Sequence, residues 1–211
     1  MQVRITYKKE TLHHAPEEER IEAICSATYR KLLEMVENGM ELMDVPDEFR
    51  TAEIYLAAVK KRWDALQYVP EEKRTEAICW AAYRGLLKMV KNGMDLMDVP
   101  KELRTANICL AAVKKQGDAL YHVPEEKHTA DIYWAAVKQN GLALRFVPEK
   151  ERTEELCREA VKQNGMALTN VPEQLRTSDI CLAAVKNQGA AFRYVPEGKR
   201  TTDICLAAAV N

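Results

Sequence analysis

Residues 100–123 read P-K-E-L-R-T-A-N-I-C-L-A-A-V-K-K-Q-G-D-A-L-Y-H-V, and near-copies of this stretch run along the 211-residue chain. All eight prolines share one register, at residues 16, 46, 70, 100, 124, 148, 172 and 196. The spacings are 30, 24, 30, 24, 24, 24 and 24 residues. A fixed period of about 20–50 residues is typical of stacked repeat proteins. The sequence therefore predicts about eight tandem units.

Each unit contains the start and stop signals of a helix. Position +5, counted from the proline, is Thr in seven of the eight units, and a Thr hydroxyl is a favoured N-cap. Basic and amide side chains near the helix end precede a glycine, as at Gly117, Gly141, Gly165 and Gly189, which predicts a helix stop. A shorter helical segment follows and ends at the valine before the next proline, because that position disfavours the α conformation.

These signals predict an all-α fold, an α-solenoid of tandem 24- to 30-residue helix-turn-short-helix repeats. We expect one helical-repeat domain over residues 1–211, with residues 1–8 as an N-terminal cap and an incomplete last unit. The two 30-residue units carry six extra residues in their long helix. Solenoids need polar caps, and residues 204–210 are apolar apart from Cys205. We therefore expect self-association through the C-terminal end, or a chain cut from a longer protein.

The predicted core is formed by positions +8, +9, +12 and +13, which cover an arc of about 140° on a helix. These positions are Ile or Leu, Cys or Tyr, mostly Ala, and Val, Tyr or Ala. All six cysteines occupy position +9, no two are closer than 24 residues, and no C-x-x-C occurs. Zinc sites use paired ligands, so the cysteines are interpreted as core residues rather than as metal ligands or disulfides. No cofactor or metal site is predicted.

The opposite arc carries the candidate partner-binding surface at positions +10 and +14, which we name the outer row. Position +14 is basic in seven of eight units, and position +10 is mostly large and apolar. The candidate residues are Trp80, Arg84, Lys114, Trp134, Lys138, Arg158, Lys162 and Lys186. Residues four apart are neighbours on a helix, which places Trp80 beside Arg84, Trp134 beside Lys138 and Arg158 beside Lys162. In the alternative interpretation, short helices cover position +10 and the cations are solvated or paired with acids.

Position +4 is Arg in seven units and His128 in the other, and we name it the arginine column. Ion pairs between stacked turns are the expected role of this column, with a ladder for phosphates as the alternative. Lys+Arg number 31 against 32 Asp+Glu, whereas dedicated nucleic-acid binders are usually basic. We therefore expect a non-catalytic protein-interaction scaffold with a protein partner. Nucleic-acid or phosphate-group binding through the stacked Lys/Arg columns is the alternative function.

Catalytic motifs do not occur in the sequence. The strings G-x-x-x-x-G-K-[ST], G-x-G-x-x-G, G-x-S-x-G and H-E-x-x-H are all missing, so neither a catalytic residue nor an enzyme is predicted. No apolar stretch approaches the ~18 residues of a membrane span, and the first residues lack the apolar centre of a secretory signal. We expect no membrane span and a cytoplasmic location, although delivery into another cell would leave no sign in these residues.

The string A-A-V-K-x-x-G-x-A-L-x-x-V-P-E-x-x-R-T, at residues 135–153, recurs in register along the chain. It resembles the repeat of the family known as domain of unknown function 4116, and the resemblance runs from about residue 9 onward. It implies a bacterial or microbial-eukaryote repeat protein of uncharacterised role, and hence a repeat fold without a mechanism. The six-residue insertions and residues 1–8 depart from the pattern.

Overall fold

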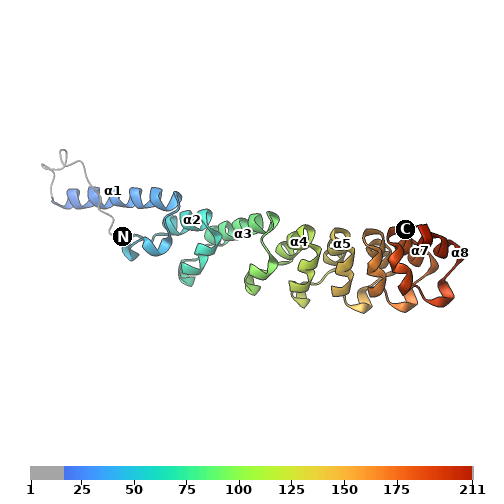
Figure 1. The fold of residues 1–211 in the computed structure, drawn as a ribbon. Coiled ribbons are helices and arrows are strands. Elements are labelled where there is room, and N and C mark those ends of the chain that lie inside the picture. The colour runs from blue at the N-terminus through green and yellow to red at the C-terminus, as the bar shows by residue number, and fades with distance from the viewer. Residues whose placement is uncertain (1–16, 211) are drawn as a thin grey trace. The chain divides into compact units, whose positions relative to one another are not determined.

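In the computed structural model, which describes residues 17–210, every regular element is a helix (Figure 1). The α-helices of this part are α1 (Glu17–Glu37), α2 (Ala52–Lys61), α3 (Glu76–Lys91), α4 (Ala106–Lys115), α5 (Ala130–Gln139), α6 (Glu154–Gln163), α7 (Ser178–Asn187) and α8 (Thr202–Val210). Short 3₁₀ helices connect them. The predicted all-α tandem-repeat fold is confirmed. The expected cap at residues 1–8 lies outside the described residues.

The chain divides into two compact units, Met1–Leu86 and Leu87–Asn211, and α3 spans the boundary. In the first unit α1 packs against α2. In the second unit each of the helices α4 to α8 packs against the next, and Figure 1 shows them side by side in colours from green to red. The single domain over residues 1–211 stays a prediction. No helix in the described part combines the length and the apolar character that crossing a membrane requires.

Each 24-residue unit contains one α-helix and two 3₁₀ helices. The longer 3₁₀ helices are η3 (Trp63–Tyr68), η7 (Gly117–His122), η9 (Gly141–Phe146), η11 (Gly165–Asn170) and η13 (Gly189–Tyr194). The shorter ones follow the prolines, at η2 (Asp47–Phe49), η4 (Glu71–Lys73), η6 (Lys101–Leu103), η8 (Glu125–Lys127), η10 (Glu149–Glu151), η12 (Glu173–Leu175) and η14 (Glu197–Lys199). The predicted N-caps are confirmed: the Thr105 hydroxyl, for example, accepts from the Ile108 N–H at 3.4 Å.

The two 30-residue units have longer α-helices, as predicted. α3 has 16 residues and α4 has 10. Their 3₁₀ helices are correspondingly short, at η1 (Leu42–Asp44) and η5 (Leu96–Asp98). Both long helices end at a glycine in the left-handed region, Gly39 with φ 114° and Gly93 with φ 110°. These are the helix stops that glycine favours because it has no Cβ.

The glycines that begin η7, η9 and η11, which we name the junction glycines, have another role. Positive φ among the described glycines occurs at Gly39 and Gly93, not at the junction glycines. A Cβ on Gly117 would come within 2.5 Å of the Ala136 carbonyl oxygen, and a Cβ on Gly141 would collide with the Ala160 carbonyl oxygen. The predicted helix stop is confirmed, since α4, α5 and α6 each end just before a junction glycine, and it is the close approach of the next α-helix that requires glycine there.

The predicted core stripe is largely confirmed. Position +8 is fully buried from Ile54 to Ile204, and so is the valine before each proline from Val45 to Val195. The cysteines depart from the prediction, since Cys109, Cys157 and Cys181 are buried whereas Cys25, Cys79 and Cys205 are exposed. The long helix α1 buries Leu32 and Val36 instead, two to three turns beyond its cysteine, because its extra residues move the packed part toward the C-terminal end.

Candidate interaction surface

The outer row is divided between the two units. Trp80 and Arg84 lie on α3 in the first unit, whereas the other six candidates lie on α4 to α7 in the second. Those six are Lys114, Trp134, Lys138, Arg158, Lys162 and Lys186. Arg84 and the four lysines are exposed, Trp80 is 56% exposed, and Trp134 and Arg158 are half-buried. Neighbouring elements therefore cover position +10 of α5 and α6 in part, and leave position +14 open to solvent.

The two tryptophans make different contacts. The Lys138 ammonium lies 5.7 Å from the centre of the Trp134 ring, so this predicted pair is confirmed as a cation–π contact. The ring of Trp80 packs edge-on against Tyr83, with centroids 5.6 Å apart. Its indole N–H donates to the Glu76 carboxylate at 3.3 Å. The contacts with Tyr83 and Glu76 were not predicted from the sequence.

Arg158 turns toward the N-terminal end of α6. Its Nη2 donates to Glu154 Oε1 at 2.8 Å, in an ion pair between residues four apart. The sequence-based argument placed Arg158 beside Lys162, and the two residues do line one groove. The ion pair of Arg158 with the carboxylate one turn earlier was not predicted. About two-fifths of each side chain in the pair is exposed, at 43% and 44%, so this pair contributes little to stability.

A groove of about 380 Å³ lies between α5 and α6. Trp134 lines it from α5, and Glu154, Glu155, Arg158, Glu159 and Lys162 line it from α6. We name it the α5–α6 groove. Three predicted residues meet there, but the three glutamates were missed from the sequence. Glu154 and Glu159 could have been found because the other helices of the second unit carry small residues at these positions, whereas Glu155 stands where α5, α7 and α8 also carry an acid.

The exposed surface of the second unit has edges of opposite charge. Position +7 carries the exposed acids Asp131, Glu155, Asp179 and Asp203 near the helix N-termini. Position +14 carries the exposed lysines near the C-termini. The two positions are seven residues apart, or about 10 Å along a helix. A partner that lies across these helices therefore meets carboxylates on one side and ammonium groups on the other.

The arginine column binds backbone carbonyls rather than acids of neighbouring turns. Arg104 donates from Nε to the Val99 carbonyl at 2.9 Å, from Nη1 to the His122 carbonyl at 2.9 Å and from Nη2 to the Met97 carbonyl at 3.3 Å. Arg152 and Arg176 repeat this pattern. The expected ion pairs between stacked turns were therefore wrong, because the planar guanidinium matches turn carbonyls that lack helical donors. Arg50 adds a local ion pair with Asp47.

His128 keeps one contact of the arginine that it replaces. Its Nε2 lies 3.1 Å from the Val123 carbonyl oxygen, the equivalent of the carbonyl that accepts from each arginine's Nε. Arg104, Arg152 and Arg176 each donate to a carbonyl 18 residues later and so hold adjacent turns together. Phosphate binding by this column stays a prediction, and the lysines at position +14 form a second basic column that is exposed.

Comparison with known families identifies the repeat. Residues 107–152, 131–176 and 153–198 each match the family described as Domain of unknown function (DUF4116). Together the three matches cover residues 107–198. The DUF4116 repeats include α5, α6 and the groove between them, but the family description carries no activity. No curated protein and no solved structure matches the chain.

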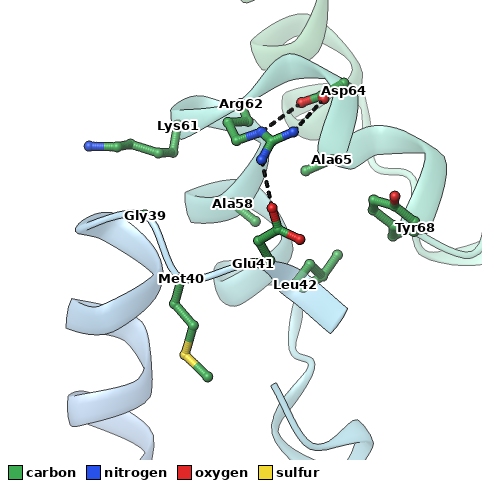
Figure 2. Close-up of a pocket in the computed structure, with 10 residues that line it drawn as sticks. All are labelled: Gly39, Met40, Glu41, Leu42, Ala58, Lys61, Arg62, Asp64, Ala65 and Tyr68. Atoms are coloured by element: carbon green, nitrogen blue, oxygen red, sulfur yellow. Dashed lines mark hydrogen bonds and ion pairs between the residues drawn. The ribbon is translucent and has the colours of Figure 1, made fainter. Parts of the chain in front are cut away.

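A smaller pocket lies in the first unit, outside the DUF4116 matches. Its volume is about 120 Å³, and its lining includes Met40, Leu42 and Tyr68 (Figure 2). Arg62 connects two acids at the pocket, with Nη1 2.8 Å from Glu41 Oε1 and Nη2 2.8 Å from Asp64 Oδ2. The hydrogen bonds from Arg62 lower the pKa of the Asp64 carboxyl. The guanidinium is therefore already matched by two carboxylates within the pocket.

Proposed function

We propose that the chain is a non-catalytic protein-interaction scaffold that binds a partner through the outer row of its second unit. The observation that carries this proposal is the half-buried Trp134, which lines a groove and has the Lys138 ammonium over its ring. Tryptophan and arginine most often dominate the energy of protein interfaces. Trp134 and Arg158 line the same groove, so two residues of this kind are available to one partner.

The repeat packing supports a scaffold role. In the second unit each α-helix packs against the next, and junction glycines bring adjacent turns close together. The outer row of this unit is consequently carried by helices rather than by loops. A surface that is ordered before binding loses less conformational entropy when the partner arrives. This favours a preformed docking surface for a protein segment.

The exposed apolar side chains of α8 support the proposed self-association. Leu206 is 60% exposed and Val210 is 83% exposed, and apolar exposure of this kind favours contact with another protein surface. Sedimentation velocity at several protein concentrations tests this part of the proposal. A single monomeric species at every concentration would overturn it. The cytoplasmic location stays a prediction.

Nucleic-acid or phosphate-group binding through the stacked Lys/Arg columns is the second candidate function. The observation in its favour is that Lys114, Lys138, Lys162 and Lys186 are all exposed. Such binding weakens steeply with salt because phosphate contacts release counterions. Capture that survives about 200 mM salt and nuclease treatment argues for a protein partner instead.

The test of the scaffold is affinity capture from nuclease-treated lysate with the full chain as bait. Trp134→Ala removes the proposed anchor, and Tyr121→Ala is the matched control because it truncates a 69% exposed aromatic residue on η7. We expect a protein that wild type and Tyr121→Ala retain and Trp134→Ala loses. Equal retention by all three would contradict the site. Retention of no protein would contradict the scaffold.

A further inference from the structure

Helices α4, α5, α7 and α8 show which residues the repeat normally carries at each position, and α6 can be compared with them. The four helices carry Ala106, Ala130, Ser178 and Thr202 at position +6, and alanine at position +11. At position +10 they carry Leu110, Trp134, Leu182 and Leu206. In α6 these three positions are Glu154, Glu159 and Arg158. Because the other helices pack in the same way with small or apolar residues there, repeat packing does not require the three charges.

The three charges gather at one place. Glu154, Arg158 and Glu159 all line the α5–α6 groove, together with Trp134, the tryptophan at position +10 of the second unit. The departures from the repeat on two adjacent helices therefore meet in the same groove. The charges on α6 and the aromatic ring on α5 form one composite surface.

The groove has an excess of negative charge. Its lining contains three carboxylates, Glu154, Glu155 and Glu159, against two cations, Arg158 and Lys162, which leaves a net charge of −1. Arg158 is paired with Glu154 at 2.8 Å. The Gln163 amide donates to Glu159 at 3.0 Å and leaves its charge uncompensated. Glu155 and Glu159 thus stand against one remaining cation of the lining, Lys162, and supply the excess negative charge that attracts a further cation.

We propose that the α5–α6 groove binds a basic side chain, lysine or arginine, of a protein partner. The proposal rests on the scaffold function, because it names the partner chemistry of the same surface. A tryptophan ring attracts a cation through its π electrons, and its surface packs against the apolar stem of a long basic side chain. The carboxylates of Glu155 and Glu159 add charge-assisted hydrogen bonds to the cationic head. A phosphate in this groove would instead meet like charge.

The experiment uses the full chain and the blocked peptide Ac-Ala-Lys-Ala-amide as the probe. The indole N–H signals of the three tryptophans are followed by NMR, and Trp134→Phe assigns the relevant signal. We expect a saturable shift of the Trp134 signal, with a dissociation constant on the order of 1–10 mM, because one side chain buries little surface. The same peptide with Glu or norleucine in place of Lys should cause no saturable shift.

Matched variants show whether the lysine peptide binds to the carboxylates of the groove or to exposed acids in general. Glu155→Gln with Glu159→Gln should weaken binding of the lysine peptide at least fivefold. Asp179→Asn with Asp203→Asn removes two exposed acids from α7 and α8 and should change it less than twofold. Trp134→Leu, which copies the residue of α4 and α7 at this position, should abolish binding while the thermal midpoint is retained.

Three outcomes would overturn the basic side chain as occupant: no saturable shift, an equal shift with norleucine, or equal weakening by the control variants. If the lysine peptide fails while Trp134→Ala still loses the captured partner, the inference falls and the scaffold function stands. If the peptide binds as expected but Trp134→Ala retains every captured protein, the groove binds a cation and the proposed partner site falls.

Discussion

Gly85 on α3 lies directly against Trp63, so closely that a Cβ on Gly85 would come 2.9 Å from the Trp63 Cβ. Trp63 begins η3, at the place where the junction glycines begin the later 3₁₀ helices. Facing those glycines, at the position of Gly85, are Gln139, Gln163 and Asn187. The Asn187 Oδ1, for example, accepts from the Gly165 N–H at 2.7 Å. At this junction the large residue, Trp63, begins the 3₁₀ helix and the glycine lies on the α-helix. At the later junctions the glycine begins the 3₁₀ helix and the larger residue lies on the α-helix.

This exchange predicts that Gly85→Ala destabilises the protein. Helix propensity alone would favour alanine by about 1 kcal/mol, whereas overpacking in a filled site typically costs about 1–3 kcal/mol. We expect a net loss of about 1 kcal/mol, because the nearest atoms belong to the rigid base of the tryptophan side chain. Urea unfolding followed by circular dichroism measures the change.

Gly198→Ala is the control for Gly85→Ala, since a Cβ on Gly198 would meet nothing within 4 Å. Its free energy of unfolding should stay within about 0.5 kcal/mol of wild type, as for most surface changes. In a Trp63→Gly background, Gly85→Ala should no longer be destabilising. A stabilising effect of Gly85→Ala in the wild-type chain would contradict the packing argument.

The arginine column predicts that His128→Arg stabilises the protein. An arginine at this position keeps a donor for the Val123 carbonyl and, by analogy with Arg104 and Arg152, reaches a carbonyl 18 residues later. A hydrogen bond from a charged group contributes about 1.5–3 kcal/mol when buried, and we expect about 1 kcal/mol at this half-buried site. Differential scanning calorimetry would show a higher thermal midpoint. His128→Lys, whose ammonium group cannot replace the planar guanidinium, should not raise the thermal midpoint.

The burial pattern predicts that three of the six thiols react quickly. Cys25, Cys79 and Cys205 are exposed, whereas Cys109, Cys157 and Cys181 are buried. Burial also raises the pKa of the Cys157 thiol to about 11, so the reactive thiolate is scarce at neutral pH. Treatment of the folded protein with iodoacetamide at pH 8, followed by mass spectrometry, should label the exposed set first. Equal rates for all six in folded protein would refute the assignment.

Stability should fall in alkaline solution because of the buried thiols. Burial raises the pKa of Cys109, Cys157 and Cys181 above the ordinary thiol pKa, which is about 8.5 in an unfolded chain. The unfolded state therefore releases protons first as the pH rises. The contribution of these groups is complete below about pH 8.5 and, for Cys157, is lost as the pH rises toward about 11.

Chemical unfolding measured from pH 8 to pH 10.5 tests this alkaline effect. Cys157→Ala should lower the free energy of unfolding overall but flatten its decline with pH. Cys205→Ala, which removes an exposed thiol, should leave the slope of wild type unchanged. Identical slopes in all three proteins would rule out the buried thiol as a cause.

The candidate site was only partly predictable from the sequence. The spacing of Trp134 and Lys138 predicted their contact, because residues four apart on one helix are neighbours whatever the tertiary structure. The ion pair between Arg158 and Glu154 depends on charge and side-chain orientation, and helix spacing alone did not predict it. The approach of Trp134 to the glutamates of α6 depended on how two helices pack, and repeat spacing alone does not describe the groove between them.

The sequence by itself determined the repeat, the helix starts and the buried stripe. Proline register, Thr caps and helical periodicity act within one unit, so the sequence of that unit predicts them without knowledge of the neighbouring helix. Only the tertiary structure decided what the junction glycines and the arginine column do, because both act on backbone carbonyls of other turns. At Gly141 this is the Ala160 carbonyl of the next helix, and at Arg152 it is the Asn170 carbonyl 18 residues away. Carbonyls are the same in every residue, so no sequence pattern shows which of them a side chain will meet.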